Sequence, residues 1–180
     1  MLQIITDIQT CIPISRIKEL LIEAYKVATN SPDPSTQNGA LLVTNTEEAL
    51  IFASDCNRFP DGIESTKERW ERPLKYEIVV HAERNVIYSV AKSGEDYFTE
   101  GAVMVCPWAA CPECAQAIIQ SGIKTLITHK QAHDRAPEAW VKKITVAFGM
   151  LDEAGVSIVM YDGDLNSEIE VRHSEKVWIP

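Results

Sequence analysis

The chain has 180 residues, 46% of them hydrophobic, which is enough to form the core of one domain. No run approaches the roughly 18 consecutive apolar residues of a membrane-spanning helix, so the composition argues against a membrane protein. Seventeen basic residues stand against 26 acidic ones, which gives a net charge of −9. A protein with this balance lacks the broad positive field that holds a nucleic-acid backbone, so we expect no polynucleotide partner.

The five cysteines, an odd number, fit a reducing compartment better than a framework of disulfides. Residues 1–10 lack the basic start and the long apolar centre of a signal peptide, so export is not expected. The sequence therefore predicts a cytoplasmic protein. Because no repeat or low-complexity tract interrupts the chain, residues 1–180 are expected to form a single domain.

The first part of the chain predicts a helix followed by a hairpin. Residues 31–34, rich in proline, end the helix, and residues 40–44 and 49–54 predict two paired strands. The connection at 57–75 is longer than most in compact domains, which makes it a candidate lid or specificity element. Ser15 is placed to cap the helix, whose apolar stripe is Ile17, Leu20, Leu21, Ala24 and Ala28.

Helices and strands alternate in the remainder of the chain. Strands that are joined through helices pair in parallel by right-handed crossovers. The alternation therefore predicts a layered α/β fold with five strands. The expected helices are at 81–92, from 111 to about 121 and at 137–154, and the expected strands are at 102–105, 123–128 and 156–161.

His81, Cys111 and Cys114 are three ligands of the kind that zinc prefers. A catalytic zinc ion keeps three protein ligands and leaves its fourth position to water, whose pKa it lowers to about 7. Glu83, two residues after the histidine, would carry protons from the water to the nitrogen of a cytosine ring and to the departing ammonia. Together these residues predict hydrolytic deamination at one catalytic zinc ion.

The two metal cysteines are predicted to lie at a helix N-terminus, whose partial positive charge favours the thiolate. Two other interpretations use the same pair. The C-x-x-C spacing alone also fits a thioredoxin-like thiol oxidoreductase, and a fourth ligand from Cys106 or Cys56 would make a structural zinc site in a binding module. His81 and Glu83 favour the hydrolase, because a redox pair needs neither residue.

Longer segments around these residues resemble the zinc-dependent cytidine and deoxycytidylate deaminase superfamily. Residues 33–40, D-P-S-T-Q-N-G-A, are similar to the D-P-S-T-Q-x-G-A of deoxycytidylate deaminases, and residues 81–85, H-A-E-R-N, are similar to their H-A-E-x-N. The resemblance covers about 15–161 and leaves a C-terminal tail at 162–180. It implies a three-layer α/β/α fold, a five-stranded mixed sheet, and zinc between two helix N-termini.

The resemblance also implies substrate contacts outside the metal group. Asn57 would bind the sugar hydroxyl or the base edge, and the backbone near Ala82 and Ala110 would meet the base. Two positions depart from the family pattern. Ala110 replaces the proline that usually precedes the first metal cysteine, and Arg58 replaces the second glycine of G-Y-N-G-F-P, a glycine associated with control by triphosphates. The Asn57-Arg58 pair is more similar to tRNA adenosine deaminases.

Several aromatic and charged residues are further candidates for substrate contacts. Phe59, Trp70 and Trp108 could form walls of the pocket, and His129 could border it at the end of the fourth strand. One or two cations ahead of the metal histidine could grip a phosphate group; the candidates are Arg58, Lys67, Arg69, Arg72 and Lys75.

The sequence thus predicts a zinc-dependent hydrolase that converts a cytosine deoxynucleotide, dCMP above all, to the uracil form with loss of ammonia. A deaminase of adenine, guanine or a modified pyrimidine would share every metal residue, so it stays open as an alternative beside the oxidoreductase and the binding module. The expected partner is a small nucleotide substrate, and the resemblance implies a homo-oligomer.

Overall fold

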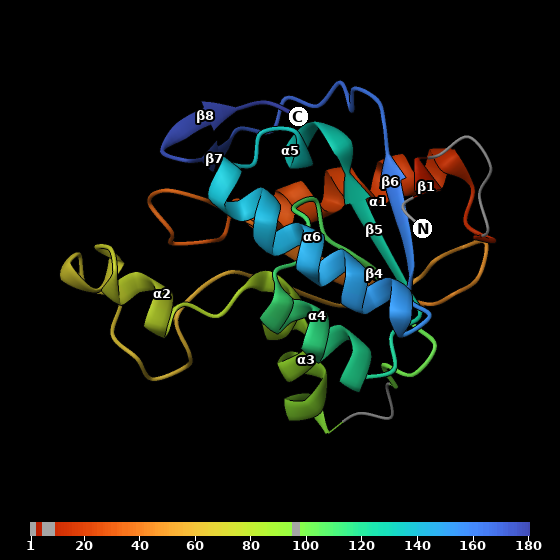
Figure 1. The fold of residues 1–180 in the computed structure, drawn as a ribbon, viewed down its shortest axis with the longest axis horizontal. Helices are drawn as coiled ribbons and strands as arrows, with labels where there is room; N and C mark the ends of the chain where they lie inside the picture. Colours follow the sequence, from red (N-terminus) through yellow and green to blue (C-terminus); the bar gives the residue numbers. More distant parts are fainter. Residues whose placement is uncertain (1–2, 5–9, 95–97) are drawn as a thin grey trace.

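The computed structural model describes residues 3–4, 10–94 and 98–180, and a mixed β-sheet forms its centre (Figure 1). Five strands lie within two residues of the predicted positions, so the five-stranded mixed sheet is confirmed, and the two-residue β1 extends it at one edge. The pairs β1–β6, β6–β5 and β5–β4 are parallel, whereas β4–β2 and β2–β3 are antiparallel. The strand order is β1 (Gln3–Ile4), β6 (Ser157–Tyr161), β5 (Thr125–His129), β4 (Val103–Val105), β2 (Gly39–Val43) and β3 (Ile51–Cys56).

Helices cover both faces of the sheet, so the predicted α/β/α layering is confirmed (Figure 1). Successive side chains of β2 alternate between two cores, as the geometry of a strand requires. Leu41 and Val43 belong to the core under α1 (Ile14–Ala28). Ala40 and Leu42 belong to the core on the other face, under α3 (Ala82–Ser93), α4 (Pro112–Gln120) and α6 (Glu138–Glu153).

Helix α1 begins two residues earlier than a cap at Ser15 would require. Its first residue is Ile14, and Pro13 occupies the N-cap position with an extended backbone, so Ser15 lies inside the first turn. The predicted cap is therefore wrong, because the fixed φ of proline suits the residue at a helix entry. The predicted apolar stripe is confirmed, since all of its members are buried: Ile17, Leu20, Leu21, Ala24 and Ala28.

Gly39 lets strand β2 lie very close to helix α1. A Cβ atom at this position would be 2.2 Å from the carbonyl oxygen of Ala24 and 2.6 Å from the nitrogen of Ala28. Both are backbone atoms, which cannot move aside without disturbing the helix. The glycine therefore fixes the path of the chain between residues 33–38 and the sheet.

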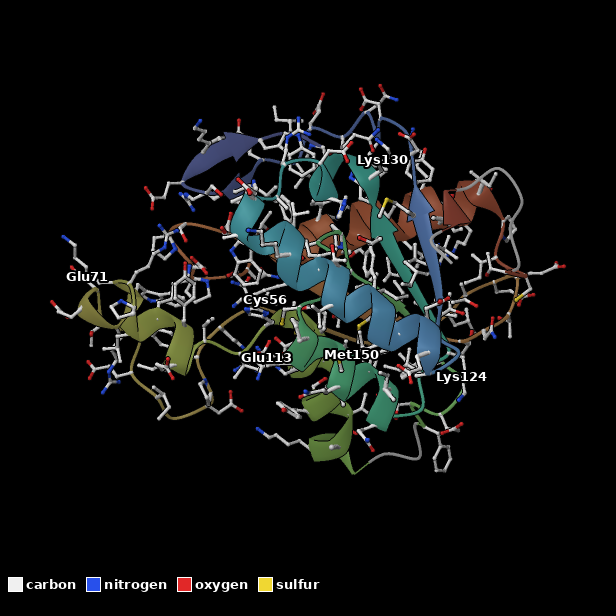
Figure 2. The ribbon with its side chains drawn as sticks, viewed as in Figure 1. Cys56, Glu71, Glu113, Lys124, Lys130 and Met150 are labelled. Carbon is white, nitrogen blue, oxygen red and sulfur yellow. The ribbon has the colours of Figure 1, made fainter. Side chains whose placement is uncertain are left out.

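The connection after β3 projects from the body of the molecule. It carries a short 3-10 helix, η1 (Glu68–Trp70), and the helix α2 (Leu74–Ile78). Glu71 lies at its outer end, whereas Cys56, the last residue of β3, lies in the body (Figure 2).

A further short helix, α5 (Lys130–His133), follows β5. Among the described residues, no helix has both the length and the apolar content that a membrane crossing requires.

The C-terminal tail folds into an antiparallel hairpin of β7 (Val171–His173) and β8 (Lys176–Trp178). This C-terminal hairpin is bound to the 33–37 segment by backbone hydrogen bonds. The N–H of Gln37 donates to the carbonyl oxygen of Arg172 at 2.9 Å, and the N–H of Glu175 donates to that of Ser35 at 2.8 Å. The hairpin therefore lies against residues 33–37, which belong to the D-P-S-T-Q-N-G-A motif at 33–40.

Candidate active site

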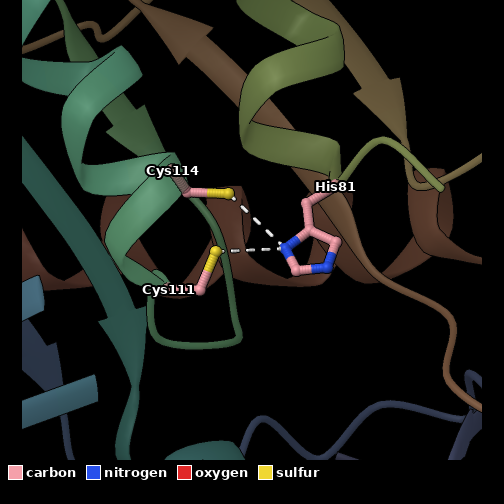
Figure 3. A group of neighbouring side chains, drawn as sticks. All are labelled: His81, Cys111 and Cys114. Carbon is pink, nitrogen blue, oxygen red and sulfur yellow. Dashed lines mark hydrogen bonds between the residues drawn. The ribbon is translucent and has the colours of Figure 1, made fainter. Parts of the chain in front are cut away.

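The three predicted zinc ligands meet where two helices begin, as predicted. His81 is the N-cap residue of α3, Cys111 is the N-cap residue of α4, and Cys114 lies in the first turn of α4. The Nδ1 atom of His81 is 3.4 Å from the sulfur of Cys111 and 3.5 Å from that of Cys114 (Figure 3). In the part of the chain that the structure describes, no other group of three His, Cys, Asp or Glu residues could hold a metal ion.

The geometry of this group fits zinc. Tetrahedral coordination with Zn–S bonds of about 2.3 Å and a Zn–N bond of about 2.0 Å places nitrogen and sulfur about 3.5 Å apart, close to the two separations of 3.4 and 3.5 Å. Hydrogen bonds with Cys114 and His81 lower the pKa of the Cys111 thiol, and the N-terminus of α4 favours the same charged form. Both effects favour the thiolate of Cys111, which is the form that binds a metal ion.

Glu83 stands beside the metal group with 2% of its surface exposed. Its Oε2 atom is buried and has no hydrogen-bond partner among the described residues. Burial raises the pKa of the Glu83 carboxyl group, because the charged form is poorly solvated there. A carboxyl group of this kind can take up a proton and release it again, as a proton shuttle must.

The two cysteines that could have closed a structural zinc site lie outside the metal group. Cys106 is fully buried, and its sulfur accepts a hydrogen bond from Nδ2 of Asn38 at 3.2 Å. Cys56 is buried at the end of β3. The metal group thus has three protein ligands and leaves a fourth position open, as in catalytic rather than structural zinc sites.

A cavity of about 550 Å³ lies beside the metal group, and His81, Glu83 and Cys111 form part of its wall. Its volume is in the range of pockets for small organic ligands. The rest of the wall comes from residues at 33–38, 57, 72–79, 108–109, 133–144 and 173–175. The polar and aromatic residues in this part of the wall are Asp33, Ser35, Thr36, Asn38, Asn57, Arg72, Lys75, Tyr76, Trp108, His133, Trp140, His173, Ser174 and Glu175.

Asn57 lines the cavity, but other protein groups occupy most of the hydrogen-bonding positions of its side-chain amide. Its Nδ2 donates to Oδ2 of Asp33 at 3.0 Å and to the carbonyl oxygen of Thr36 at 2.9 Å. Its Oδ1 accepts the backbone N–H of Asn38 at 2.7 Å. One acceptor position of Oδ1 is left, so a ligand that contacts the Asn57 amide must donate a hydrogen bond to it.

Asp33 and Lys75 form a buried ion pair in the cavity wall. Asp33 is 2% exposed and Lys75 is 6% exposed. The ammonium group lies 2.7 Å from Oδ2 of Asp33 and donates to Oγ of Ser35 at 2.6 Å. Of the candidate phosphate-binding cations, Lys75 is therefore already paired. Arg72 also lines the cavity, and its partner Glu175 is farther away, at 3.8 Å.

Arg58 and Phe59, predicted as substrate contacts, do not line the cavity. The guanidinium group of Arg58 turns to two local carboxylates, Asp55 at 3.0 Å and Asp61 at 2.5 Å. Phe59 is buried and stacks on Trp70, with ring centroids 4.0 Å apart. Local partners thus occupy both side chains. Lys67, Arg69 and Trp70 are likewise absent from the cavity wall.

His129 does not border the cavity either. It is fully buried, with its Nδ1 2.8 Å from the hydroxyl of Tyr25 and its Nε2 2.9 Å from the carbonyl oxygen of Gly163. Both ring nitrogens therefore have protein partners, and the histidine is part of the packing between α1 and the C-terminal segment. Ala82 and Ala110 are fully buried outside the wall, so their backbone contacts to a base stay predictions.

Trp108 lines the cavity as predicted, and it stacks on a residue to which the sequence assigned no role. The rings of Trp108 and His173 are 4.0 Å apart at an angle of 17°. Alternation of polar and apolar residues at 168–172, before Ser174, was the one signal for this hairpin. Cavity residues without a sequence-based role include His133, Trp140, His173, Ser174 and Glu175.

Comparisons with known proteins agree with this site. The family model described as the cytidine and deoxycytidylate deaminase zinc-binding region matches residues 14–130. An uncharacterized deaminase of Aliivibrio fischeri is 32% identical over 142 residues, which cover 79% of this chain and 90% of that protein. The deoxycytidylate deaminase of Pongo abelii is 34% identical over 140 residues, which cover 74% of this chain and 72% of that protein.

A solved structure shows the same fold. The dCMP deaminase of cyanophage S-TIM5, in complex with dCMP and dUMP, superimposes with a TM-score of 0.56 at 22% identity, over 80% of this chain and 96% of that one. The region matched by the family model contains the three zinc ligands and Glu83. The chain therefore belongs to the cytidine and deoxycytidylate deaminase family, whose members are zinc-dependent hydrolases of carbon–nitrogen bonds.

Proposed function

We propose that the protein removes the amino group of a cytosine nucleotide, in the first place dCMP, and releases the uracil nucleotide and ammonia. The observation that carries this proposal is the buried Glu83 carboxyl group in the same cavity wall as the zinc ligands His81 and Cys111. The deoxycytidylate deaminase among its relatives supports the choice of substrate.

The residues of the site divide the reaction between them. His81, Cys111 and Cys114 would hold the zinc ion, which when bound supplies a Lewis acid that makes water a nucleophile near neutral pH. Glu83 takes a proton from the water and delivers it to N3 of the ring. Once the water oxygen has bonded to C4, Glu83 moves the proton of the new C4 hydroxyl to the amino group as the carbon–nitrogen bond breaks, so that ammonia leaves and the carbonyl of uracil forms.

The cavity supports a mononucleotide better than a polynucleotide. A volume of about 550 Å³ suits one nucleotide, and the net charge of −9 disfavours a long phosphate backbone. Trp108 and Trp140 offer flat apolar walls for a ring. Arg72, whose ion pair with Glu175 is long and exposed, is the cation best placed to meet a phosphate group.

The test is ammonia release by the zinc-loaded protein across dCMP, dCTP, CMP, deoxycytidine, cytosine, guanine and adenosine. We expect the highest kcat/KM with dCMP. A preference for guanine or adenosine would overturn the choice of a cytosine ring, and a preference for deoxycytidine over dCMP would overturn the choice of a nucleotide. Zinc-loaded protein that releases no ammonia from any of these compounds would contradict the proposal as a whole.

A further inference from the structure

Like Oε2 of Glu83, the side-chain oxygen of Asn38 is a polar atom of the cavity wall that has no partner in the described part of the chain. Asn38 is 8% exposed, and its carboxamide oxygen Oδ1 is buried with no hydrogen bond to the described part of the chain. Asn38 lines the same cavity as His81 and Glu83. Because leaving a buried carbonyl oxygen unpaired is costly, an atom of this kind at a cavity wall indicates a ligand that donates a hydrogen bond to it.

The other polar groups of Asn38 are fixed by the protein. Its backbone N–H donates to Oδ1 of Asn57 at 2.7 Å, and its carbonyl oxygen accepts the N–H of Asn57 at 3.1 Å. Its Nδ2 donates to the sulfur of Cys106 at 3.2 Å, and the same sulfur accepts the backbone N–H of Trp108. Since the sulfur accepts both N–H groups, the amide turns its nitrogen toward Cys106 and leaves its oxygen free.

The place of Asn38 in the sequence suits a residue that selects the substrate. In the segment similar to D-P-S-T-Q-x-G-A, it occupies the position that the family pattern leaves open. The next residue, Gly39, holds the backbone against α1 and so keeps position 38 in a constant place. The side chain at position 38 can therefore change what the cavity binds without changing the zinc ligands.

The chemistry of a cytosine nucleotide limits the donors that could meet this oxygen. The ring has one donor group, its amino group, which must face Glu83 to leave as ammonia. The other donors are the hydroxyl groups of the sugar. Asn57, adjacent to Asn38, likewise has only an acceptor position to offer, so the two residues form a region of the wall suited to a hydroxyl.

We propose that Oδ1 of Asn38 accepts a hydrogen bond from a sugar hydroxyl of the substrate, and that Asn38 is thereby a residue that determines specificity for the sugar. This inference rests on the proposed function, because it takes the substrate to be a cytosine nucleotide. Cys106 acts as a positioning residue, since it orients the amide and does not line the cavity.

The test compares dCMP with 2′,3′-dideoxy-CMP, which lacks the sugar hydroxyl, in the wild type and in Asn38→Leu, whose side chain has a similar shape but no acceptor. The wild type should lose about 10- to 100-fold in kcat/KM without the hydroxyl. Asn38→Leu should show a similar loss with dCMP and should no longer distinguish the two substrates. If this variant prefers dCMP as strongly as the wild type does, the proposal is overturned.

Two further measurements keep the inference testable if Asn38→Leu folds poorly. Equal kcat/KM for the two substrates in the wild type would overturn it without any variant. Asn38→Asp retains an acceptor and should keep the preference for the hydroxyl, whereas losing the preference would mean that the amide presents its N–H group instead.

Affinity for the products gives a readout that does not depend on turnover. Calorimetry should show that the zinc-loaded wild type binds dUMP about 10- to 100-fold more tightly than 2′,3′-dideoxy-UMP, and that Asn38→Leu binds them equally. Failure of the proposed function would appear differently, as a wild type that neither deaminates dCMP nor binds dUMP. Turnover of dCMP with no discrimination at the sugar would overturn the role of Asn38 alone.

Discussion

The metal group and the opposite parts of the cavity wall differ in how the chain builds them. His81 and Glu83 lie two residues apart at one helix N-terminus, and Cys111 and Cys114 lie three residues apart at another. Local spacing therefore sets most of their geometry. The remaining wall joins Asn57 to segments near residues 33–38, 72–79, 133–144 and 173–175, which meet only through tertiary packing. The reaction chemistry is thus encoded locally, whereas the fit to the substrate depends on the whole fold.

The largest effect is expected from loss of a metal ligand. Cys114→Ala removes one of three ligands, so the protein should lose its zinc ion and all measurable ammonia release. Zinc content per chain and turnover of dCMP check this on the same sample. Cys11→Ala is the matched control, because Cys11 is exposed and outside the metal group. A Cys114→Ala protein that keeps both zinc and activity would mean that the metal group is wrongly assigned.

The next largest effect is expected from breaking the buried ion pair of Asp33 and Lys75 in the cavity wall. Asp33→Asn leaves the Lys75 ammonium buried beside a neutral amide, so the free energy of unfolding should fall by about 3–5 kcal/mol. Urea denaturation measures this change in the free energy of unfolding. Glu23→Gln, which breaks an exposed pair with Lys26, should cost at most about 1 kcal/mol. Similar small losses in both variants would show that the wall does not depend on the Asp33–Lys75 pair.

A smaller effect is expected from a variant that tests whether His129 has a structural role or contacts the substrate. Tyr25→Phe removes the hydroxyl group 2.8 Å from Nδ1 of His129 and should reduce the free energy of unfolding by about 1–3 kcal/mol. The kcat/KM for dCMP should stay unchanged, because neither residue lines the cavity. Denaturation and steady-state kinetics measure the two quantities. Lost activity at unchanged stability would return His129 to the group of substrate contacts.

The smallest effect is expected at the exposed pair of Arg72 and Glu175. Glu175→Gln removes a negative charge from the cavity wall, so the KM for dCMP should fall about two- to fivefold while the free energy of unfolding changes by less than about 1 kcal/mol. Deoxycytidine, which has no phosphate, is the control and should keep its KM. An equal change for both substrates would place the phosphate away from Arg72.

Much of the fold was predictable because its signals are periodic. The apolar stripe of α1 and the five strands follow from spacing along the chain. The metal group was predictable for a related reason, since its residues come in two short motifs. The start of α1 was not, because Pro13 rather than Ser15 determines the helix entry.

The substrate contacts were harder to predict because competing partners are invisible in a motif. Arg58 follows Asn57 directly, yet Asp55 and Asp61, three residues away on either side, bind its guanidinium group. His129 ends a strand near the site, but a hydroxyl from α1 and a backbone carbonyl take both of its nitrogens. The residues of the C-terminal hairpin reach the cavity through tertiary packing on the 33–37 segment and on Trp108.

Glu83→Gln gives the most direct test of the central claim, that Glu83 moves protons for a reaction at the zinc group. Ammonia release from dCMP should be measured for the zinc-loaded wild type and variant, with the zinc content of each sample determined in parallel. Both proteins should hold one zinc ion per chain, and the variant should be slower by at least about 10²- to 10⁴-fold, because the metal ligands survive and the proton shuttle does not. A variant with zinc bound that deaminates dCMP at the wild-type rate would contradict the account.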